Sequence, residues 1–209
     1  MLIQLLIDNP TSWIVPYAIK LKKMIIKQFD YPVNLIHNHK EVVKGDVLCL
    51  LSCEKIFKKL NYNDYNLVVH ESDLPYGKGW SPLTWQVLEG KCKIPITLFE
   101  AAETVDSGRI YAQGVIELNG NELLSEIKHK QGLKTIDLIL KFINNFPMEG
   151  KKQEGKETFY KKRTVKDSEL DIHKTIADQF DLLRISDNER YPAHFFINGV
   201  KYLLKITKE

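Results

Sequence analysis

Cysteine is scarce in this chain. Cys49, Cys53 and Cys92 are its only cysteines, and no two of them have C-x-x-C spacing. His37 and His39 stand apart from them in a polar segment. An odd, dispersed set of cysteines supports neither a disulfide framework nor a zinc site, so no metal is expected.

The chain also lacks a concentrated charge of one sign. Its 30 Lys and Arg are interspersed with 27 Asp and Glu, for a net charge of +3. The short basic cluster at residues 161–163 is typical of a solvated surface. A nucleic-acid binder is expected to carry a basic stripe, so we expect no nucleic-acid partner.

No apolar run reaches the length of a membrane span, so no membrane partner is expected. Residues 1–7 are apolar but lack a positive leader, and they are interpreted as a first strand of a cytoplasmic protein. No G-x-G-x-x-G follows that strand, which disfavours a dinucleotide cofactor.

Strand-like and helical segments alternate along most of the chain. Strands are expected at 1–7, 32–36, 47–51, 67–70 and 94–100, and helices at 16–28, 54–60, 82–89 and from Asn121 to residue 144. Such alternation predicts an α/β fold with a Rossmann-like, doubly wound, mostly parallel sheet. At 209 residues and 44% hydrophobic content, one sizeable domain with an appendage fits.

The composition changes near residue 148. Residues 148–158 are rich in Lys, Glu and Gly, and they predict a linker or exposed loop between a main domain, 1–147, and a small C-terminal α+β module, 159–209. In that module a helix is expected near 175–183. Asn198-Gly199 is a strong signal for a β-hairpin.

Two residues suggest an active site. His70 ends an apolar strand and precedes a loop rich in Gly and Pro, and Asp106 stands in the turn Asp-Ser-Gly after the next strand. Ligands of open α/β sheets bind outside the carboxyl ends of the strands. A carboxylate beside an imidazole fixes its tautomer and supports its positive form, so the pair suits proton transfer. Taken singly, each residue also fits a structural role.

The segment around these residues resembles the folate-dependent formyltransferases, a family that includes methionyl-tRNA, glycinamide ribonucleotide and nucleotide-sugar N-formyltransferases. The resemblance is dense from about residue 67 to residue 111. It rests on His70, Ser72, Leu74, Pro75, Gly77, Lys78, Gly79, Pro82, Trp85, Gly90, Ile96, Thr97, Leu98, Asp106 and Gly108.

The resemblance implies a catalytic core of His70, Asp106 and Ser72 that moves a formyl group from 10-formyltetrahydrofolate to a primary amine. His70 would take the amine proton or stabilise the intermediate, and Asp106 would orient His70. By the same resemblance, the folate would be bound by Leu74, Pro75, Gly77, Lys78, Gly79, Trp80 and Pro82.

One position departs from the family. Val68 stands where the family has an Asn that polarises the formyl group. Loss of one such donor can cost on the order of a hundredfold in rate. Ser72, a backbone N–H or Asn66 could substitute for it; otherwise the protein is slow or inactive.

The C-terminal module is most similar to nucleotide-sugar N-formyltransferases, which implies a UDP- or dTDP-linked 4-amino-4,6-dideoxy sugar as acceptor, for surface glycan or glycoprotein synthesis. Moderate charge and short length favour a small amine over transfer RNA. The implied substrate contacts are Tyr160, Arg163, Arg184, Asp187, Asn188, Tyr191 and Phe195. Arg184 could instead tie the module to the sheet.

Two other functions stay open: an inactive binding homologue, and an enzyme acting on an amine such as glycinamide ribonucleotide. Exposed apolar strands in the C-terminal module leave a homodimer open as well.

Overall fold

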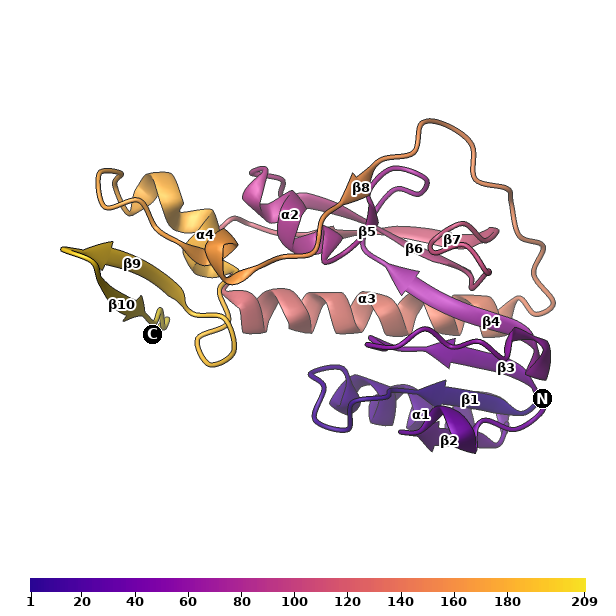
Figure 1. The fold of residues 1–209 in the computed structure, drawn as a ribbon. Helices are drawn as coiled ribbons and strands as arrows, with labels where there is room; N and C mark the ends of the chain where they lie inside the picture. Colours follow the sequence, from indigo (N-terminus) through magenta and orange to yellow (C-terminus); the bar gives the residue numbers. More distant parts are fainter.

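The computed structural model describes residues 1–209. Its centre is one sheet with the strand order β2-β1-β3-β4-β6-β7 (Figure 1). The strands are β1 (Ile3–Leu6), β2 (Val33–Ile36), β3 (Gly45–Leu50), β4 (Asn63–His70), β6 (Lys93–Glu100) and β7 (Ile110–Glu117). The first four are parallel, and β6 and β7 are antiparallel to their neighbours. The predicted Rossmann-like, mostly parallel sheet is confirmed.

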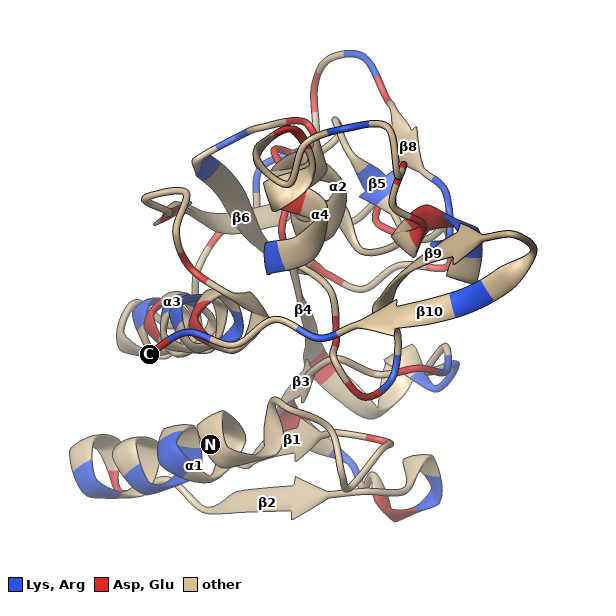
Figure 2. Ribbon diagram, turned by 90° about the vertical axis from the view of Figure 1, so that its left-hand side faces the viewer, with Lys and Arg blue, Asp and Glu red and all other residues tan.

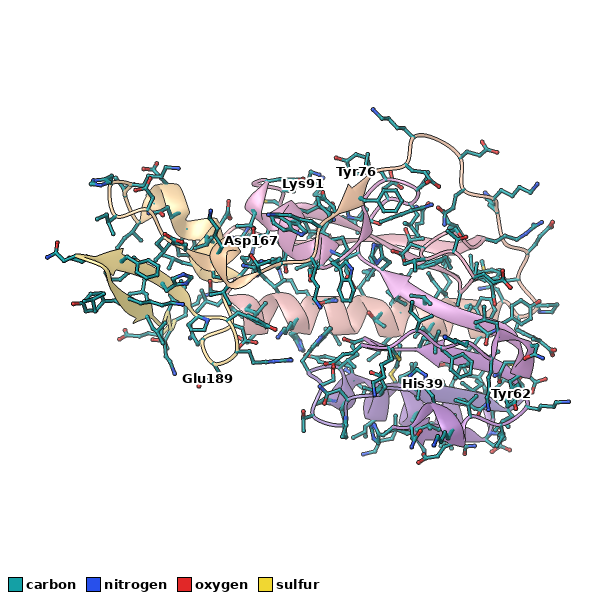
Figure 3. All side chains as sticks on the ribbon, viewed as in Figure 1. His39, Tyr62, Tyr76, Lys91, Asp167 and Glu189 are labelled. Carbon is teal, nitrogen blue, oxygen red and sulfur yellow. The ribbon has the colours of Figure 1, made fainter.

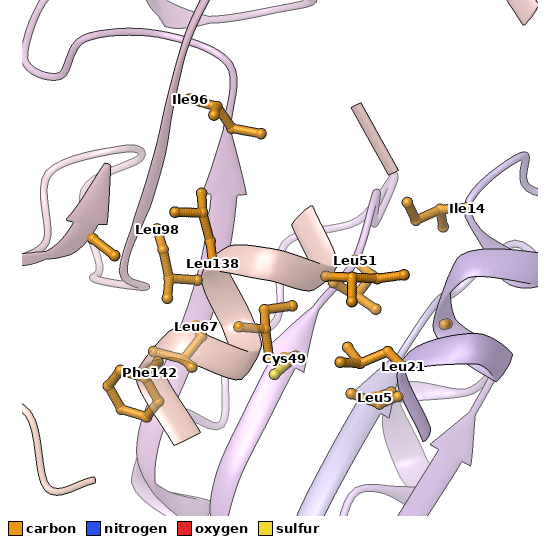
Figure 4. Close-up of a cluster of buried hydrophobic side chains, with 14 of the residues drawn as sticks. Leu5, Ile14, Leu21, Cys49, Leu51, Leu67, Ile96, Leu98, Leu138 and Phe142 are labelled. Atoms are coloured by element: carbon orange, nitrogen blue, oxygen red, sulfur yellow. The ribbon is translucent and has the colours of Figure 1, made fainter. Parts of the chain in front are cut away.

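Helices α1 (Val15–Phe29) and α3 (Leu124–Asn144) pack on one face of this sheet. The main core, a cluster of 27 buried residues, lies between them and the strands. Figure 4 shows Leu5, Cys49 and Leu67 of the strands beside Leu21 of α1 and Phe142 of α3.

The opposite face carries a smaller cluster of six buried residues and no α-helix. A helix was predicted over residues 54–60, and this prediction is wrong, because only the 3₁₀ turn η2 (Leu60–Tyr62) forms there. The carboxylate of Asp8 accepts the backbone N–H groups of Glu54 and Lys55, and Phe57 is buried in the cluster. The burial of Phe57 overrides the local helical pattern.

Helices α2 and α3 begin at Pro82 and Leu124. The expected helix at 82–89 is α2 (Pro82–Leu88). Helix α3 starts at Leu124, with the carboxylate of Glu126 accepting the backbone N–H of Leu123, and not directly after Asn121 as expected. None of the helices has the length and apolarity needed to cross a membrane.

Residues 148–158 form an extended, irregular segment along the outside of the sheet. The chain then returns to the loop after β4, where β8 (Phe159–Tyr160) pairs in parallel with β5 (Lys78–Gly79). The C-terminal module is therefore attached directly to the loop that follows His70. Its proposed boundaries stay a prediction.

The C-terminal module contains η3 (Val165–Ser168), η4 (Ala177–Gln179), α4 (Phe180–Arg184), β9 (Ala193–Ile197) and β10 (Val200–Leu204). The expected helix at 175–183 is divided between η4 and α4. The predicted hairpin is confirmed, with β9 and β10 antiparallel. Asn198 and Gly199 between them have φ values of 49° and 78°, which the tight hairpin turn requires.

Candidate active site

A cavity of about 350 Å³ opens at the carboxyl ends of β3 and β4. Its walls are residues 50–53 after β3, residues 69–71 at the end of β4, and residues 79–84 at the start of α2. Helix α3 closes one side with Leu124, Lys128, Gln131 and Thr135. Open α/β sheets bind ligands at this edge, so the cavity is the candidate active site.

His70 is the last residue of β4 and is only 8% exposed. Its Nε2 lies 3.0 Å from the carbonyl oxygen of Gly77 and 3.8 Å from Oδ2 of Asp106. Two acceptors around one ring nitrogen favour the tautomer in which Nε2 carries the hydrogen. The lone pair then lies on Nδ1, which is left to accept a proton from a substrate.

Asp106 stands in the turn between β6 and β7 with a φ of 55°, a left-handed conformation. Its Oδ2 accepts the backbone N–H of Gly79 at 2.9 Å. The amide of Gln153 donates to the carbonyl oxygens of Asp106 and Gly108, at 2.9 and 2.8 Å. The extended segment 148–158 thereby holds the turn that places the carboxylate beside His70.

No protein-family model matches the chain. The curated methionyl-tRNA formyltransferase of Thermosipho melanesiensis is 30% identical over 154 residues, which cover 70% of this chain and 49% of the relative. The chain thus spans about half the length of the curated relatives it matches.

The solved methionyl-tRNA formyltransferase from Clostridium thermocellum superposes with a TM-score of 0.84, covering 100% of this chain and 93% of that one at 21% identity. The chain has the formyltransferase fold. The resemblance drawn from the motif around His70 is confirmed.

Two further solved structures share this fold. A 4-N formyltransferase from Francisella tularensis gives a TM-score of 0.72 at 19% identity, over 100% of this chain and 98% of that one. HypX from Aquifex aeolicus, in complex with tetrahydrofolic acid, gives 0.77 at 15% identity, over 98% of this chain and 37% of that one. At these identities the likeness concerns the fold.

Within this formyltransferase fold, the loop predicted to bind folate is divided. Gly79, Trp80 and Pro82 line the cavity, whereas Leu74, Pro75, Gly77 and Lys78 do not. Lys78 is buried and forms an ion pair with Glu157. The half-exposed ring of Trp80 has the Nζ of Lys162 4.7 Å from its centre. The folate-binding roles stay predictions.

Asn66 and Ser72, the two side chains that could replace the donor absent at Val68, have different surroundings. The Nδ2 of Asn66 donates to the carbonyl oxygen of Leu60 at 2.8 Å, so this amide is engaged away from the cavity. Ser72 is buried, and its Oγ has no hydrogen-bond partner. Val68 packs against the smaller apolar cluster.

Sequence reasoning missed Glu71 and Gln131, which line the cavity next to His70. The Nε2 of Gln131, on α3, donates to Oε1 of Glu71 at 2.6 Å. Burial raises the pKa of the Glu71 carboxyl above its usual range. The only signal in the sequence was the position of Glu71 beside His70.

Three of the predicted substrate contacts are engaged in packing. The ring of Tyr160 stacks on Trp85, with centroids 6.4 Å apart. Arg163 donates to the backbone of Asp167, and burial lowers the pKa of its guanidinium. Arg184 is 1% exposed and lies in ion-pair distance of Asp181 and Glu122, at 2.6 and 3.8 Å. This arrangement matches the alternative in which Arg184 ties the module to the main domain.

Of the other four, Asp187, Asn188 and Tyr191 lie in the segment before β9, and Phe195 is part of β9. Asp187 is 3.7 Å from Nζ of Lys128, a residue of the cavity wall. Asn188 makes two hydrogen bonds with the backbone of Ile206. Tyr191 is half-exposed, and Phe195 stacks on Tyr202. None of the seven lines the cavity, and their substrate contacts stay predictions.

Proposed function

We propose that the protein transfers a formyl group from 10-formyltetrahydrofolate to the amino group of a nucleotide-linked aminosugar. The observation that carries the proposal is His70, which lines the cavity at the end of β4 with its Nε2 beside Gly77 and Asp106. The formyltransferase fold supports the reaction class. The HypX complex with tetrahydrofolic acid supports the donor.

The side chains of the site suit this chemistry. When the amine nitrogen forms its bond to the formyl carbon, Nδ1 of His70 accepts the proton that the nitrogen loses. Breaking the bond between that carbon and N10 of the folate returns the proton to N10. Asp106, 3.8 Å from Nε2, stabilises the imidazolium in between.

The cavity fits a folate in two respects. Its volume of about 350 Å³ is in the usual range for small-molecule sites. The ring of Trp80 on its wall is a flat apolar surface of the kind on which a heterocycle packs. We infer that the donor enters along the segment from Gly79 to Pro82.

The distribution of charge on the surface favours a small charged acceptor over transfer RNA. Figure 2 shows Lys and Arg scattered among Asp and Glu and not gathered in one stripe. Lys128 provides a single cation at the cavity wall, which suits a phosphate group of a nucleotide-linked sugar. The protein would then act in the cytoplasm, and its product would be used for the synthesis of surface glycans.

Initiator methionyl-tRNA is the second candidate acceptor. It is favoured by the curated relative at 30% identity and by the TM-score of 0.84, both to methionyl-tRNA formyltransferases. The sugar N-formyltransferase structures match with lower TM-scores, such as 0.71 for the enzyme from Shewanella.

A panel assay separates these acceptors. The protein is incubated with 10-formyltetrahydrofolate and, in separate reactions, UDP- and dTDP-linked 4-amino-4,6-dideoxy sugars, glycinamide ribonucleotide and initiator methionyl-tRNA, and the products are read by mass spectrometry. We expect one sugar to gain a formyl group. Formylation of the tRNA alone would replace the proposed acceptor, and no product with intact folate binding would indicate the inactive homologue.

A further inference from the structure

Asp8, His39 and Cys53 come together at the carboxyl edge of the sheet. Asp8 follows β1, His39 follows β2, and Cys53 follows β3, so three neighbouring strands each deliver one side chain. One ligand atom from each lies within 4.8 Å of the other two. In Figure 3, His39 lies near the end of β1.

The separations are close to those of a tetrahedral zinc site. Nε2 of His39 and Oδ2 of Asp8 are 3.2 Å apart. Zinc bonds to nitrogen and oxygen of about 2.0–2.1 Å at tetrahedral angles put two such ligands about 3.3 Å apart. A zinc–sulfur bond of about 2.3 Å puts sulfur about 3.6 Å from them, so the Cys53 side chain has to close by about 1.2 Å at most.

Neighbouring groups hold two of these side chains in place. The backbone N–H groups of Glu54 and Lys55 donate to Oδ1 and Oδ2 of Asp8, at 2.8 and 2.9 Å, and this carboxylate is only 5% exposed. The ring of His39 packs against Phe57 with centroids 5.6 Å apart. Outer contacts of this kind orient metal ligands.

Cys53 has the weakest attachment of the three. Its thiol donates only to the carbonyl oxygen of Leu6, over 3.3 Å. A thiol is a weak donor, so the hydrogen bond that a metal would replace is a weak one. Cys53 also lines the active-site cavity, so one member of the cluster belongs to the cavity wall.

We propose that Asp8, His39 and Cys53 form a binding site for Zn²⁺. A carboxylate, an imidazole and a thiolate are ligands that zinc accepts together, and three protein ligands leave a fourth position for water. Binding displaces the proton of the Cys53 thiol to solvent and ties the loops after β1, β2 and β3 to each other. The C-x-x-C rule could not detect this site, because its ligands come from three separate loops.

Metal binding tests the proposal without folate or acceptor. Tag-free protein is treated with a chelator, desalted, and titrated with Zn²⁺ and, separately, with Co²⁺. We expect about one metal per chain by elemental analysis, and a near-ultraviolet absorption band of a cobalt–thiolate bond. Absence of stoichiometric binding to the wild type would overturn the proposal and leave the proposed function untouched.

Variants identify the ligands. Cys53→Ser is expected to lose the thiolate band, and His39→Gln to bind Zn²⁺ at least about tenfold more weakly. Cys92→Ser, at an exposed cysteine, is the matched control and should keep both signals. Circular dichroism checks that each variant is folded. A thiolate band that persists in Cys53→Ser and disappears in Cys92→Ser would place the metal elsewhere.

Discussion

The carbonyl oxygen of Gly77 lies 3.0 Å from Nε2 of His70, and this contact fixes which ring nitrogen carries hydrogen. The loop after β4 thus folds back onto the histidine that ends the strand. With Asp106 on the same side of the ring, Nδ1 is left for chemistry.

We predict that His70 is the Nε2–H tautomer when neutral. ¹⁵N NMR of histidine-labelled protein at a pH above the titration of the ring measures this directly, with His70→Asn supplying the assignment. A resonance pattern with hydrogen on Nδ1 would contradict the arrangement and reverse the proton path proposed for the reaction.

Gln153 is predicted to act through Asp106. Its amide donates to the carbonyl oxygens of Asp106 and Gly108, and Gln153→Ala removes both bonds. We expect kcat to fall by about tenfold, with the KM for the folate little changed, because a displaced carboxylate misorients His70. Gln28→Ala, at an exposed residue of α1, is the control. An equal effect of both variants would show that Gln153 has no positioning role.

The segment that contains Gln153 shows why part of the site could not be predicted. The sequence identified 148–158 only as a linker or exposed loop, since it is polar and lacks periodicity. Its hydrogen bonds to the Asp106 turn join residues more than forty positions apart. His70 and Asp106 could be proposed from the sequence because one ends a strand and the other stands in a turn after a strand, features that are local; their catalytic roles stay predictions.

The fold shows the same difference between features set by local sequence and features set by contacts between distant residues. Strands β1 to β4 and β6, helices α1 and α2, and the hairpin at Asn198 follow from local hydrophobic patterns and turn residues, and they were predicted. The edge strand β7 and the short pair β5 and β8 were not predicted. The helix expected at 54–60 does not form, and Phe57 is instead buried against strand residues that are distant in the sequence. Glu71 and Gln131 were missed for a similar reason, since sixty positions separate them.

Glu71 should make stability depend on pH. Burial raises the pKa of its carboxyl, so the folded protein binds more protons than the unfolded chain between the two pKa values. Stability contributed by the neutral carboxyl is therefore present at low pH and falls as pH rises through that window. We expect Glu71→Gln to show a flatter decline of melting temperature with rising pH than the wild type does. Glu149→Gln, at an exposed carboxyl, should follow the wild type. Parallel curves for wild type and Glu71→Gln would contradict the burial of this group.

Val68→Asn tests whether the site lacks a donor. Val68 and His70 are two residues apart on β4 and point to the same face. Because Asn66 is engaged by Leu60, we expect the new amide to raise kcat by about tenfold or more. The melting temperature of the variant is measured as well, because replacing Val68 removes its contacts with the smaller apolar cluster. An unchanged kcat in a folded variant would show that Ser72 or a backbone N–H already supplies the donor.

The most direct test of the account compares formyl transfer by the wild type and by His70→Asn, using 10-formyltetrahydrofolate and the acceptor identified in the panel. Tetrahydrofolate binding is measured on the same samples, and His173→Asn, at an exposed histidine, serves as the control. We predict a loss of about a hundredfold or more in the rate for His70→Asn, with folate binding retained. A His70→Asn variant that transfers the formyl group at the wild-type rate would contradict the assignment of this site.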